Sequence, residues 1–485
     1  MKCFSTIGKP TPFQWVVVIV ASLCISGAFA AELHIGAAAI SITPDQPVAV
    51  AGQIRTRIAR TVESEVTAQA LAIESREQGK SLEQSLLIAC DLLAIRGDIH
   101  QRVREGLTQR IPDFDGTKLI LSATHTHTAP VMTEGIYKIP EEGVMQPAAY
   151  AEFLIKQLIE VAVQAWDNRQ EGAVAWGMGN AVVGYNRRSY FEDGHAQMYG
   201  DITVPGFRGI EGPGDPGVEI LYFWAKDQKL IATAINVVCP SQEVESRSTV
   251  NADFWHPVRE SLKEKYGKEL VVLGWAGAAG DQSPHIRYRQ AAEDRMRELR
   301  KLDRLDEIAR RIVNAWEEAY TGASQDIRKE APFIHNVKTI HLPLRPVTEA
   351  EVAYAKSEME KVADQPDLYR AYVWHEAVLK RYATQEAGTT KPYEMELHTL
   401  RIGDIAIATN DFELFSQYGI QMKARSKALQ TFIIQLAGPG TYIPTPHAAA
   451  GEGYSAIVQS NDVGALGGQV LTDTTIDAVN ALWTD

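Results

Sequence analysis

The stretch QSLLIACDLLAI, residues 84–95, is an apolar run of the length expected for a buried strand, and the segments after it indicate the fold. The next segment, IHQRVREGLTQRI at 99–111, has an amphipathic helical pattern. KLILSATH, at 118–125, is a second buried strand. A strand, a helix and a strand in this order predict a β-α-β unit with at least one parallel pair of strands.

Strands and helices are mixed along the rest of the chain, which favours an α/β organisation. The patterns predict helices, a hairpin, a buried strand and, near the end, a second α/β section. No internal repeat, low-complexity tract or Pro/Ser linker marks a boundary between two domains. The predicted segments are helices at 150–168, 290–320 and 348–365 (the last capped by Thr348), a hairpin at 219–238, a strand at 269–277, and α/β segments at 397–415 and 430–445.

Residues 1–30 have the features of a secretory signal peptide. Lys2 and Lys9 precede an apolar stretch, and Ala28-Phe29-Ala30 is an A-x-A cleavage site. We expect cleavage after Ala30 and a mature chain, starting at Ala31, that is periplasmic or secreted. The apolar stretch is too short for a membrane-spanning helix, and no later segment is predicted to be transmembrane.

Composition excludes some classes of function. Of 485 residues, 45% are hydrophobic and 22% are charged, as in soluble globular proteins. The formal charge of −13 becomes −15 without the two signal-peptide lysines, which argues against binding to nucleic acid or to an anionic membrane. Cys90 and Cys239 remain in the mature chain within apolar runs. Buried free thiols are expected there, with a disulfide as the alternative.

Two histidines, His125 and His127, stand where the strand at 118–125 passes into a loop. In a strand, residues two apart project to the same face, so this spacing can present two imidazoles to a divalent metal such as zinc. The flanking threonines can orient the rings. General acid–base and structural roles stay open, and the H-x-H-x-D-H pattern of metallo-β-lactamase-like hydrolases is absent.

A second candidate is GWAGAAGDQSPH, which brings Asp281, Ser283 and His285 within five residues of one another. Small residues let backbone N–H groups approach a ligand, and a serine in such a turn can be an activated nucleophile. The alternative is a tight turn in which the Asp and Ser side chains cap backbone groups. The segment is not the G-x-S-x-G elbow of the α/β-hydrolases.

Three weaker candidates follow. In NADFWHPVRE, Asp253 and His256 lie three apart at a predicted helix start, which puts them on one face; the alternative is an N-cap and a packed histidine. Glu413, in NDFELF, follows a strand and precedes a helix, where a glutamate commonly interacts with the helix dipole. Arg187 and Arg188, in GYNRRSY, can bind a carboxylate or an oxyanion.

Taken in order, these segments resemble the neutral/alkaline (non-lysosomal) ceramidase family, secreted zinc amidases that cleave ceramide to sphingosine and a fatty acid. The resemblance runs over most of the mature chain. Of its two most specific motifs, T-H-T-H-S-G-P reads T-H-T-H-T-A-P here, and G-D-x-S-P is intact. It implies an α/β (mixed α+β) fold, with a catalytic domain over 31–485 whose mixed β-sheets are flanked by helices. The segments that carry it are VTAQALAIES, ATHTHTAP, YNRRSY, NVVCPSQ, GDQSP, DFELF and TYIPT.

The resemblance also implies roles for individual residues. Ser283 would be the nucleophile, Arg187 would help to bind the oxyanion, and His127 would lie near the reacting group. The implied catalytic residues are Ser283, His127, Arg187 and Asp281, and the implied zinc ligands are His125, Glu413 and Tyr442.

In one place the sequence departs from the family. The family has a further zinc histidine in a stretch like N-W-F-[A]-x-H-G-T-S, whereas NVVCPSQEV has none, with Cys239 or Ser241 near that place. We expect His256 to restore a ligand from a neighbouring turn. The family's C-terminal Ig-like domain is also expected to be missing, because the sequence stops at Asp485.

The expected function is therefore a zinc-dependent amidase with a serine nucleophile that acts on ceramide-like lipids. Two alternatives stay open: a related hydrolase of another acylated lipid, sugar or peptide, and a catalytically silent secreted homologue without metal. Within 346–385, Tyr369, Tyr372 and Trp374 belong either to a packed aromatic helix face or to a lid over an acyl chain.

Overall fold

The predicted β-α-β unit is present in the computed structural model, which describes residues 31–483; the predicted signal peptide lies outside the described residues. The unit consists of β5 (Lys80–Cys90), α1 (Ile99–Arg110) and β6 (Leu119–Ala123). β5 and β6 are parallel, with Leu86 opposite Leu119. Both strands are apolar because both faces of this part of the sheet are covered, which confirms the prediction.

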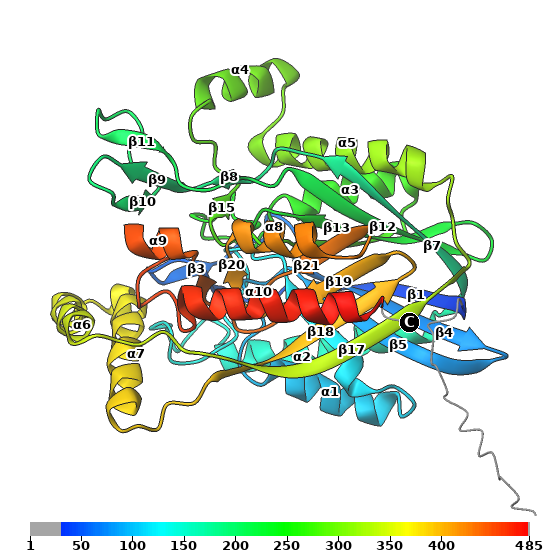
Figure 1. Ribbon diagram of the computed structural model, residues 1–485, viewed down its shortest axis with the longest axis horizontal. Coiled ribbons are helices and arrows are strands. Elements are labelled where there is room, and N and C mark those ends of the chain that lie inside the picture. Colours follow the sequence, from blue (N-terminus) through cyan, green and yellow to red (C-terminus); the bar gives the residue numbers. More distant parts are fainter. Residues whose placement is uncertain (1–30, 484–485) are drawn as a thin grey trace, which may run out of the picture.

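The unit forms one edge of a nine-stranded mixed sheet (Figure 1). The strand order is β14-β13-β12-β7-β1-β4-β5-β6, with β16 beside β1. The predicted hairpin at 219–238 is confirmed as the antiparallel pair β12–β13, and the predicted strand at 269–277 is β14, parallel to β13. The further strands are β1 (Ala31–Ser41), β4 (Thr67–Glu77), β7 (Gln170–Asn180), β12 (Gly217–Ala225), β13 (Leu230–Val237), β14 (Val271–Ala276) and β16 (Glu330–Ala331).

Helices cover one face of this sheet, and a second sheet covers the other. Along β4, Ala70 and Ala72 face the helices, whereas Leu71 and Ile73 face the second sheet, as the alternation of a strand requires. The covering helices are α1, α2 (Pro147–Asp167), α3 (Trp255–Tyr266) and α5 (Arg304–Ala323). The second sheet has the order β17 (Phe333–Leu342), β18 (Tyr393–Ile402), β19 (Ile405–Thr409) and β21 (Gln430–Ile434).

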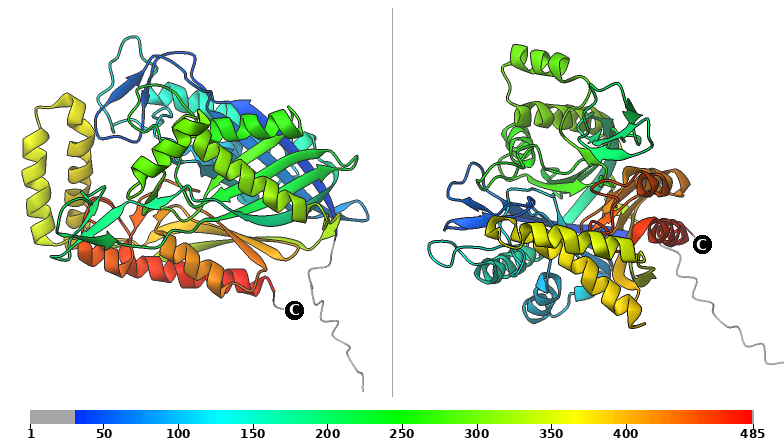
Figure 2. Two further views of the ribbon diagram at one scale, coloured as in Figure 1. Left: turned by 90° about the horizontal axis from the view of Figure 1, so that it is seen from above. Right: turned by 90° about the vertical axis from the view of Figure 1, so that its left-hand side faces the viewer.

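The second sheet alternates in the same way, so the molecule has four layers, α/β/β/α (Figure 2). Ile405 and Ile407 pack against the large sheet, and Ala406 and Ala408 face the last two long helices. Those helices are α8 (Ser416–Arg425) and α10 (Gly464–Ala481). The fold class is thus the predicted one: mixed sheets flanked by helices.

Two helical predictions meet different outcomes. The region 290–320 is two helices, α4 (Gln290–Arg300) and α5, rather than one. Lys301 adopts a left-handed conformation that ends α4, and the side chain of Asp303 accepts a hydrogen bond from the Asp306 N–H, which starts α5. Thr348 is confirmed as an N-cap.

At one end of the molecule, α6 (Glu349–Val362) and α7 (Tyr369–Glu386) form a helical hairpin (Figure 1, left). The short elements connect the layers. They are β2 (Val48–Val50), β3 (Arg57–Ala59), η1 (Gly116–Lys118), β8 (Tyr185–Asn186), β9 (Arg188–Phe191), β10 (Ala196–Met198), β11 (Phe207–Ile210), β15 (Gln282–Ser283), η2 (Pro366–Leu368), β20 (Glu413–Leu414), β22 (Tyr442–Ile443) and α9 (Pro446–Gly451).

One further sequence-based expectation is met within residues 31–483. Cys90 and Cys239 are both buried free thiols. No helix in the described part of the chain is long and apolar enough to cross a membrane.

A buried ion pair joins the two halves of the large sheet. Asp91, directly after β5, is fully buried, and Arg259 of α3 reaches it with two hydrogen bonds of 2.7 and 3.0 Å. The Arg259 Nε atom donates to the carbonyl of Val272 in β14. The Asp91 carboxylate also accepts hydrogen bonds from the N–H and hydroxyl of Thr67. Arg259 therefore fixes the positions of α3, β14 and the end of β5 relative to one another.

Replacing Arg259 by methionine should lower the free energy of unfolding by about 3–5 kcal/mol, because Asp91 is left charged, buried and unpaired. Urea or guanidinium unfolding measures the change. Lys265→Met on the same helix is the control, since Lys265 pairs with Glu317 at the surface and should cost less than about 1 kcal/mol. Equal losses for the two variants would contradict the role given to the buried pair.

Candidate active site

A cavity of about 600 Å³ collects most of the residues that the sequence singled out. It lies where the loops after β5 and β6 meet β20 and β22, and α7 of the helical hairpin forms part of its wall. Its polar lining includes Arg96, His125, His127, Arg187, Tyr199, Glu245, Arg370, Glu413, Tyr442 and Tyr454, and its apolar lining includes Val131, Met132, Ile136, Val373 and Trp374.

His125 is held by the backbone of the loop that follows β5. Its N–H donates to the carbonyl of Leu92, and its Nδ1 lies 2.7 Å from the carbonyl oxygen of Leu93. A carbonyl oxygen only accepts, so Nδ1 carries the proton, and in the neutral ring Nε2 has a free lone pair. The imidazole is thus aimed by the same loop that begins at Asp91.

The prediction that His125 and His127 lie at the end of a strand is wrong. β6 ends at Ala123, and His125 has a φ of +69°, so the pair lies in a loop rather than in a strand. The rings still come together, with centroids 4.8 Å apart and planes at 80°. The rings are close because His125 has a left-handed backbone conformation and is held by hydrogen bonds to the preceding loop, and not because the two residues alternate along a strand.

His125 and Glu413 face each other across the cavity wall. Nε2 of His125 lies 3.2 Å from Oε2 of Glu413, and it is buried without a hydrogen-bond partner. Two acceptors at this distance need a cation between them, either a proton or a metal ion. Two ligand atoms on a tetrahedral zinc ion would be about 3.3 Å apart, so the observed separation fits a metal site.

Tyr442 is the next group in this set. β20 and β22 are parallel and place Tyr442 directly opposite Glu413. The Tyr442 hydroxyl accepts a 3.0 Å hydrogen bond from Nη2 of Arg187. Within residues 31–483, no three side chains of the types His, Cys, Asp and Glu are grouped so that they would hold a metal ion. The set observed here has two side chains of those types and one phenol.

Arg187 brings a positive charge to the same wall. Its Nη2 also donates to the carbonyl of Gly280, and its Nε is buried without a partner. Its backbone N–H donates to the carbonyl of Asp281, which fixes it beside the Gly/Ala-rich turn. Arg187 can therefore bind an oxyanion in the cavity. Arg188, in contrast, is paired with Glu211 outside the cavity lining.

His127 lies beside a carboxylate that the sequence analysis did not single out. Its Nδ1 is 3.4 Å from Oε2 of Glu245, and burial lowers the pKa of its imidazole well below the usual value, so the ring is neutral. Gly52 packs against the ring: a Cβ at that position would lie 2.5 Å from Cγ of His127. Glu245 directly follows NVVCPSQEV, the segment in which the family's histidine is missing. Only its closeness to that departure pointed to it.

Ser283 is fully buried in β15, where it pairs with Tyr185 of β8. Its Oγ accepts a 3.0 Å hydrogen bond from the N–H of His285. Ser283 does not itself line the cavity, whereas Tyr199, whose phenol oxygen lies 3.2 Å from Nδ1 of His285, does. Tyr199 was also missed by the sequence analysis, because no motif contains it.

Besides Ser283, two further predicted site residues, Asp281 and His256, do not line the cavity. Asp281 uses both carboxylate oxygens to hold the start of α8: Oδ1 accepts from the Ser416 N–H at 2.8 Å, and Oδ2 accepts from the Ser416 hydroxyl and the Asn186 amide, both at 2.9 Å. It fits the alternative of a capping aspartate rather than a catalytic one. His256 is exposed in the first turn of α3.

The expectation that His256 supplies a zinc ligand is therefore corrected. Asp253 precedes α3 with a φ of +55° and is buried, with its carboxylate accepting hydrogen bonds from the Val244 and Phe254 N–H groups. The left-handed residue breaks the helical spacing, so Asp253 and His256 do not share a face. Near the place of the missing histidine, Cys239 is a buried thiol whose pKa is raised by burial, and the Ser241 hydroxyl is buried without a partner.

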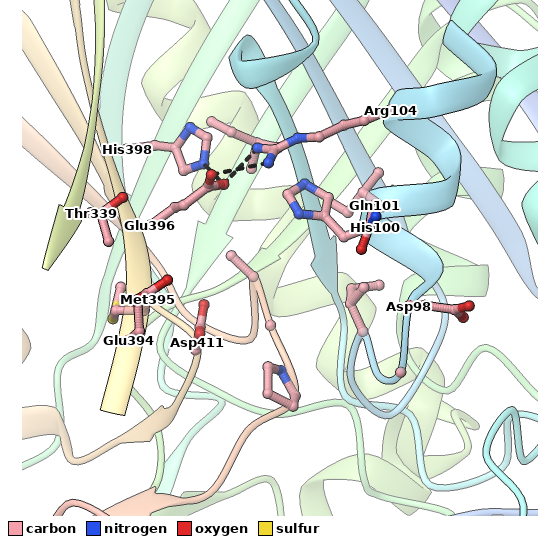
Figure 3. A pocket seen from close by; sticks show the side chains of 17 residues that line it. Asp98, His100, Gln101, Arg104, Thr339, Glu394, Met395, Glu396, His398 and Asp411 are labelled. Carbon is pink, nitrogen blue, oxygen red and sulfur yellow. Dashed lines mark hydrogen bonds and ion pairs between the residues drawn. The ribbon is translucent and has the colours of Figure 1, made fainter. Parts of the chain in front are cut away.

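A second cavity, of about 440 Å³, lies on the other side of the wall formed by the segments 93–98 and 437–441 (Figure 3). Arg104 and Glu396 pair there through two hydrogen bonds of 3.0 and 2.6 Å. Burial lowers the pKa of His100 to about 4, so this histidine is neutral. None of the sequence-predicted site residues lines this cavity. The larger cavity is therefore the candidate active site.

Comparison with known proteins supports the fold. None of the family models matches this chain, and no curated protein matches it by sequence. Among solved structures, the chain is similar to the neutral ceramidase from Pseudomonas aeruginosa, with a TM-score of 0.67 and 17% identity over 93% of this chain and 74% of that one. It is also similar to a structure described as a ceramidase complexed with C2, with a TM-score of 0.64, 14% identity and coverages of 93% and 75%. The chain has the fold of neutral ceramidases.

The facing pair His125 and Glu413 predicts a bound divalent cation. Purified protein dialysed against zinc and then against buffer should retain about one equivalent, measured by elemental mass spectrometry. His125→Ala and Glu413→Gln should each weaken metal binding by about 100-fold or more, because each removes one ligand of the set.

His256→Ala is the matched control for this measurement, since it removes an exposed imidazole on α3 and should leave the metal content unchanged. Retention of zinc by both His125→Ala and Glu413→Gln would contradict the site.

Proposed function

We propose that this protein is a secreted, zinc-dependent amidase that hydrolyses the N-acyl bond of ceramide-like lipids to a fatty acid and a sphingoid base. The neutral ceramidase fold supports this function. The observation that carries the proposal is the convergence of His125, Glu413, Tyr442 and Arg187 on one cavity wall, with Ser283 in the turn that Arg187 contacts through the Gly280 carbonyl.

The candidate ligands for zinc are His125, Glu413 and Tyr442. A zinc ion bound there would supply Lewis-acid polarisation of the substrate carbonyl. The unpartnered lone pair on Nε2 of His125 opposite a carboxylate supports this assignment, and the parallel pairing of Glu413 with Tyr442 adds a third oxygen or nitrogen donor on the same wall.

The chain's own groups have separate tasks in the proposed reaction. Ser283 is the nucleophile that attacks the carbonyl carbon of the amide. Arg187, fixed by the Gly280 carbonyl and the Tyr442 hydroxyl, binds the oxygen that becomes negative. His127 is neutral and buried beside Glu245, so its imidazole can exchange a proton with the leaving amine.

The apolar part of the cavity supports a lipid substrate. Val131, Met132 and Ile136 line one side, and Val373 and Trp374 of α7 line another. Trp374 also packs against Tyr454, with ring centroids 5.6 Å apart. Tyr369 and Tyr372 stack on each other and do not line the cavity. The lid alternative for 346–385 is thus supported for the Trp374 part of α7, and the packed-face alternative for the two tyrosines.

The proposed place of action is the periplasm or the exterior of the cell, on the basis of the sequence of residues 1–30. The partner is a small lipid or another acylated substrate rather than nucleic acid, in keeping with the acidic charge. An N-acyl lipid other than ceramide would use the same groups.

The mature chain, from Ala31 onward, should release fatty acid from a labelled N-acyl sphingosine, and Ser283→Ala should reduce the rate by about 10⁴-fold or more, because the nucleophile is lost. Cys239→Ala is a control that removes a buried thiol without touching the cavity lining. Release that persists in Ser283→Ala would contradict the serine mechanism. If the folded wild-type protein releases no fatty acid, its zinc content decides between the two alternatives. Bound zinc would favour a hydrolase of another acylated substrate, and absence of zinc would favour a catalytically silent homologue.

Gly52→Ala should lower turnover by at least about 10-fold, because the added methyl group displaces the His127 ring. Gly97→Ala is the matched control: Gly97 also has a positive φ, of 68°, but a Cβ there meets nothing within 4 Å. Both variants carry the backbone strain, and Gly52→Ala alone moves the imidazole. Similar turnover in the two would contradict a role for His127 in the reaction.

A further inference from the structure

Two arginines line the cavity of the candidate active site without a carboxylate partner. Arg96 lies in the loop after β5, and Arg370 lies in the first turn of α7. In the described part of the chain, neither guanidinium group has a nitrogen within 4 Å of an Asp or Glu carboxylate oxygen. Nε of Arg96 donates a 3.2 Å hydrogen bond to the carbonyl oxygen of Pro439, and its two terminal nitrogens make none within residues 31–483. Both charges are therefore available to a ligand.

The carboxylates that line the same cavity have other partners. Each of them lies 3.1 to 3.4 Å from a side chain that is neither of these two arginines, in the pairs Glu413–His125, Glu245–His127 and Asp462–Arg381. Burial also raises the pKa of Glu245, which reduces its negative charge. The cavity thus contains uncompensated positive charge, although the whole chain has a formal charge of −13.

This positive charge favours the binding of an anion. Burial, and after it the positive charge of Arg370, lower the pKa of Arg96, which is the effect of a cation held away from water without a counter-ion. Partly buried cations of this kind are stabilised by a bound anion. The planar guanidinium group binds the oxygens of a carboxylate, sulfonate or phosphate with two hydrogen bonds.

Helix α7 places an apolar surface next to Arg370. Arg370, Val373, Trp374 and Ala377 have the spacing i, i+3, i+4 and i+7, so they share one face of the helix, and all four line the cavity. An apolar chain that packs along this face would reach Arg370 at the start of the helix. The cavity is therefore suited to a molecule that has both an apolar chain and a negatively charged group.

We propose that the substrate is an N-acyl compound whose amine half carries a negatively charged group, such as a carboxylate or a sulfonate, and that Arg96 and Arg370 bind this group. The proposal rests on the proposed function, in which an N-acyl bond is hydrolysed in this cavity. The charge is assigned to the amine half because a fatty acyl chain is uncharged and fits the apolar lining. Ceramide carries no negative charge, so the two arginines favour an N-acyl amino acid or a similar conjugate over ceramide.

Binding to the Ser283→Ala variant tests the proposal without turnover. Isothermal titration calorimetry gives the Kd for N-decanoylglycine and for N-decanoylglycinamide, which has the same acyl chain and the same N-acyl bond but no charge. N-decanoylglycine should bind about 10-fold to 100-fold more tightly, because the uncharged amide loses the charge-assisted hydrogen bonds to the arginines. N-decanoyltaurine carries a sulfonate instead, and the tighter of the two charged conjugates identifies which anion the site prefers.

Arg96→Met and Arg370→Met, each combined with Ser283→Ala, assign the preference to the arginines. Each should weaken the binding of N-decanoylglycine by about 10-fold or more and that of N-decanoylglycinamide by less than about 3-fold, because methionine keeps an apolar stem and removes the charge. Thermal unfolding shows whether each variant is folded.

Lys380→Met is the matched control, also combined with Ser283→Ala. Lys380 lies on α7 as well, but its side chain is exposed, pairs with Glu376 at 2.8 Å and does not line the cavity. This variant should leave both affinities unchanged, which separates a local contact from the loss of one positive charge on the helix.

Equal Kd values for N-decanoylglycine and N-decanoylglycinamide, or a preference for the charged compound that survives in both arginine variants, would overturn the anion site. Fatty-acid release by the wild-type protein tests the proposed function separately. Release from N-decanoyl sphingosine without any preference for charged conjugates would overturn the anion site and leave the amidase function standing. Arginine-dependent binding of N-decanoylglycine without release of decanoic acid from any of these compounds would overturn the amidase function and leave the anion site standing.

Discussion

The buried ion pair between Asp91 and Arg259 is the interaction on which the rest of the structure depends. It closes the end of β5 against α3 and, through the Val272 carbonyl, against β14, so it ties the two halves of the nine-stranded sheet. The residues directly after Asp91 then supply the carbonyl groups that hold His125. The buried Asp91 carboxylate, which holds the sheet together, thus also helps to set the orientation of the His125 imidazole in the candidate site.

The candidate site joins segments from distant parts of the chain because the two sheets pack face to face. The loop after β6 comes from the large sheet, whereas Glu413 and Tyr442 follow strands of the second sheet. Asp281, which binds the start of α8 through the Ser416 N–H and hydroxyl, keeps the serine-bearing turn in contact with a helix that packs on that sheet. The aspartate of the motif therefore places the serine, and the chemistry is left to the groups around it.

Local patterns predicted the strands, the main helices and the segments that meet at the cavity, because apolar runs, caps and small-residue turns depend on near neighbours in the chain. They failed where one residue left the regular conformation. Because His125 and Asp253 have positive φ values, His125 is not in the predicted strand and Asp253 is not in the helical turn that contains His256. Lys301, also with a positive φ, ends α4 and divides one predicted helix into two. Glu245 and Tyr199 belong to no motif, because the histidines beside them, His127 for Glu245 and His285 for Tyr199, lie far away in the sequence.

The sequence by itself determined the class of fold, the buried free thiols and the identity of His125, Glu413, Tyr442, Arg187 and Ser283 as candidates, because residue type and spacing are enough to recognise a strand, a turn or a motif. Only the tertiary structure decided which of them converge. It aimed Nε2 of His125 at Glu413, turned His256 to solvent and placed the Tyr199 phenol beside His285. The reason is physical: orientation is set by backbone conformation and by packing between segments far apart in the chain.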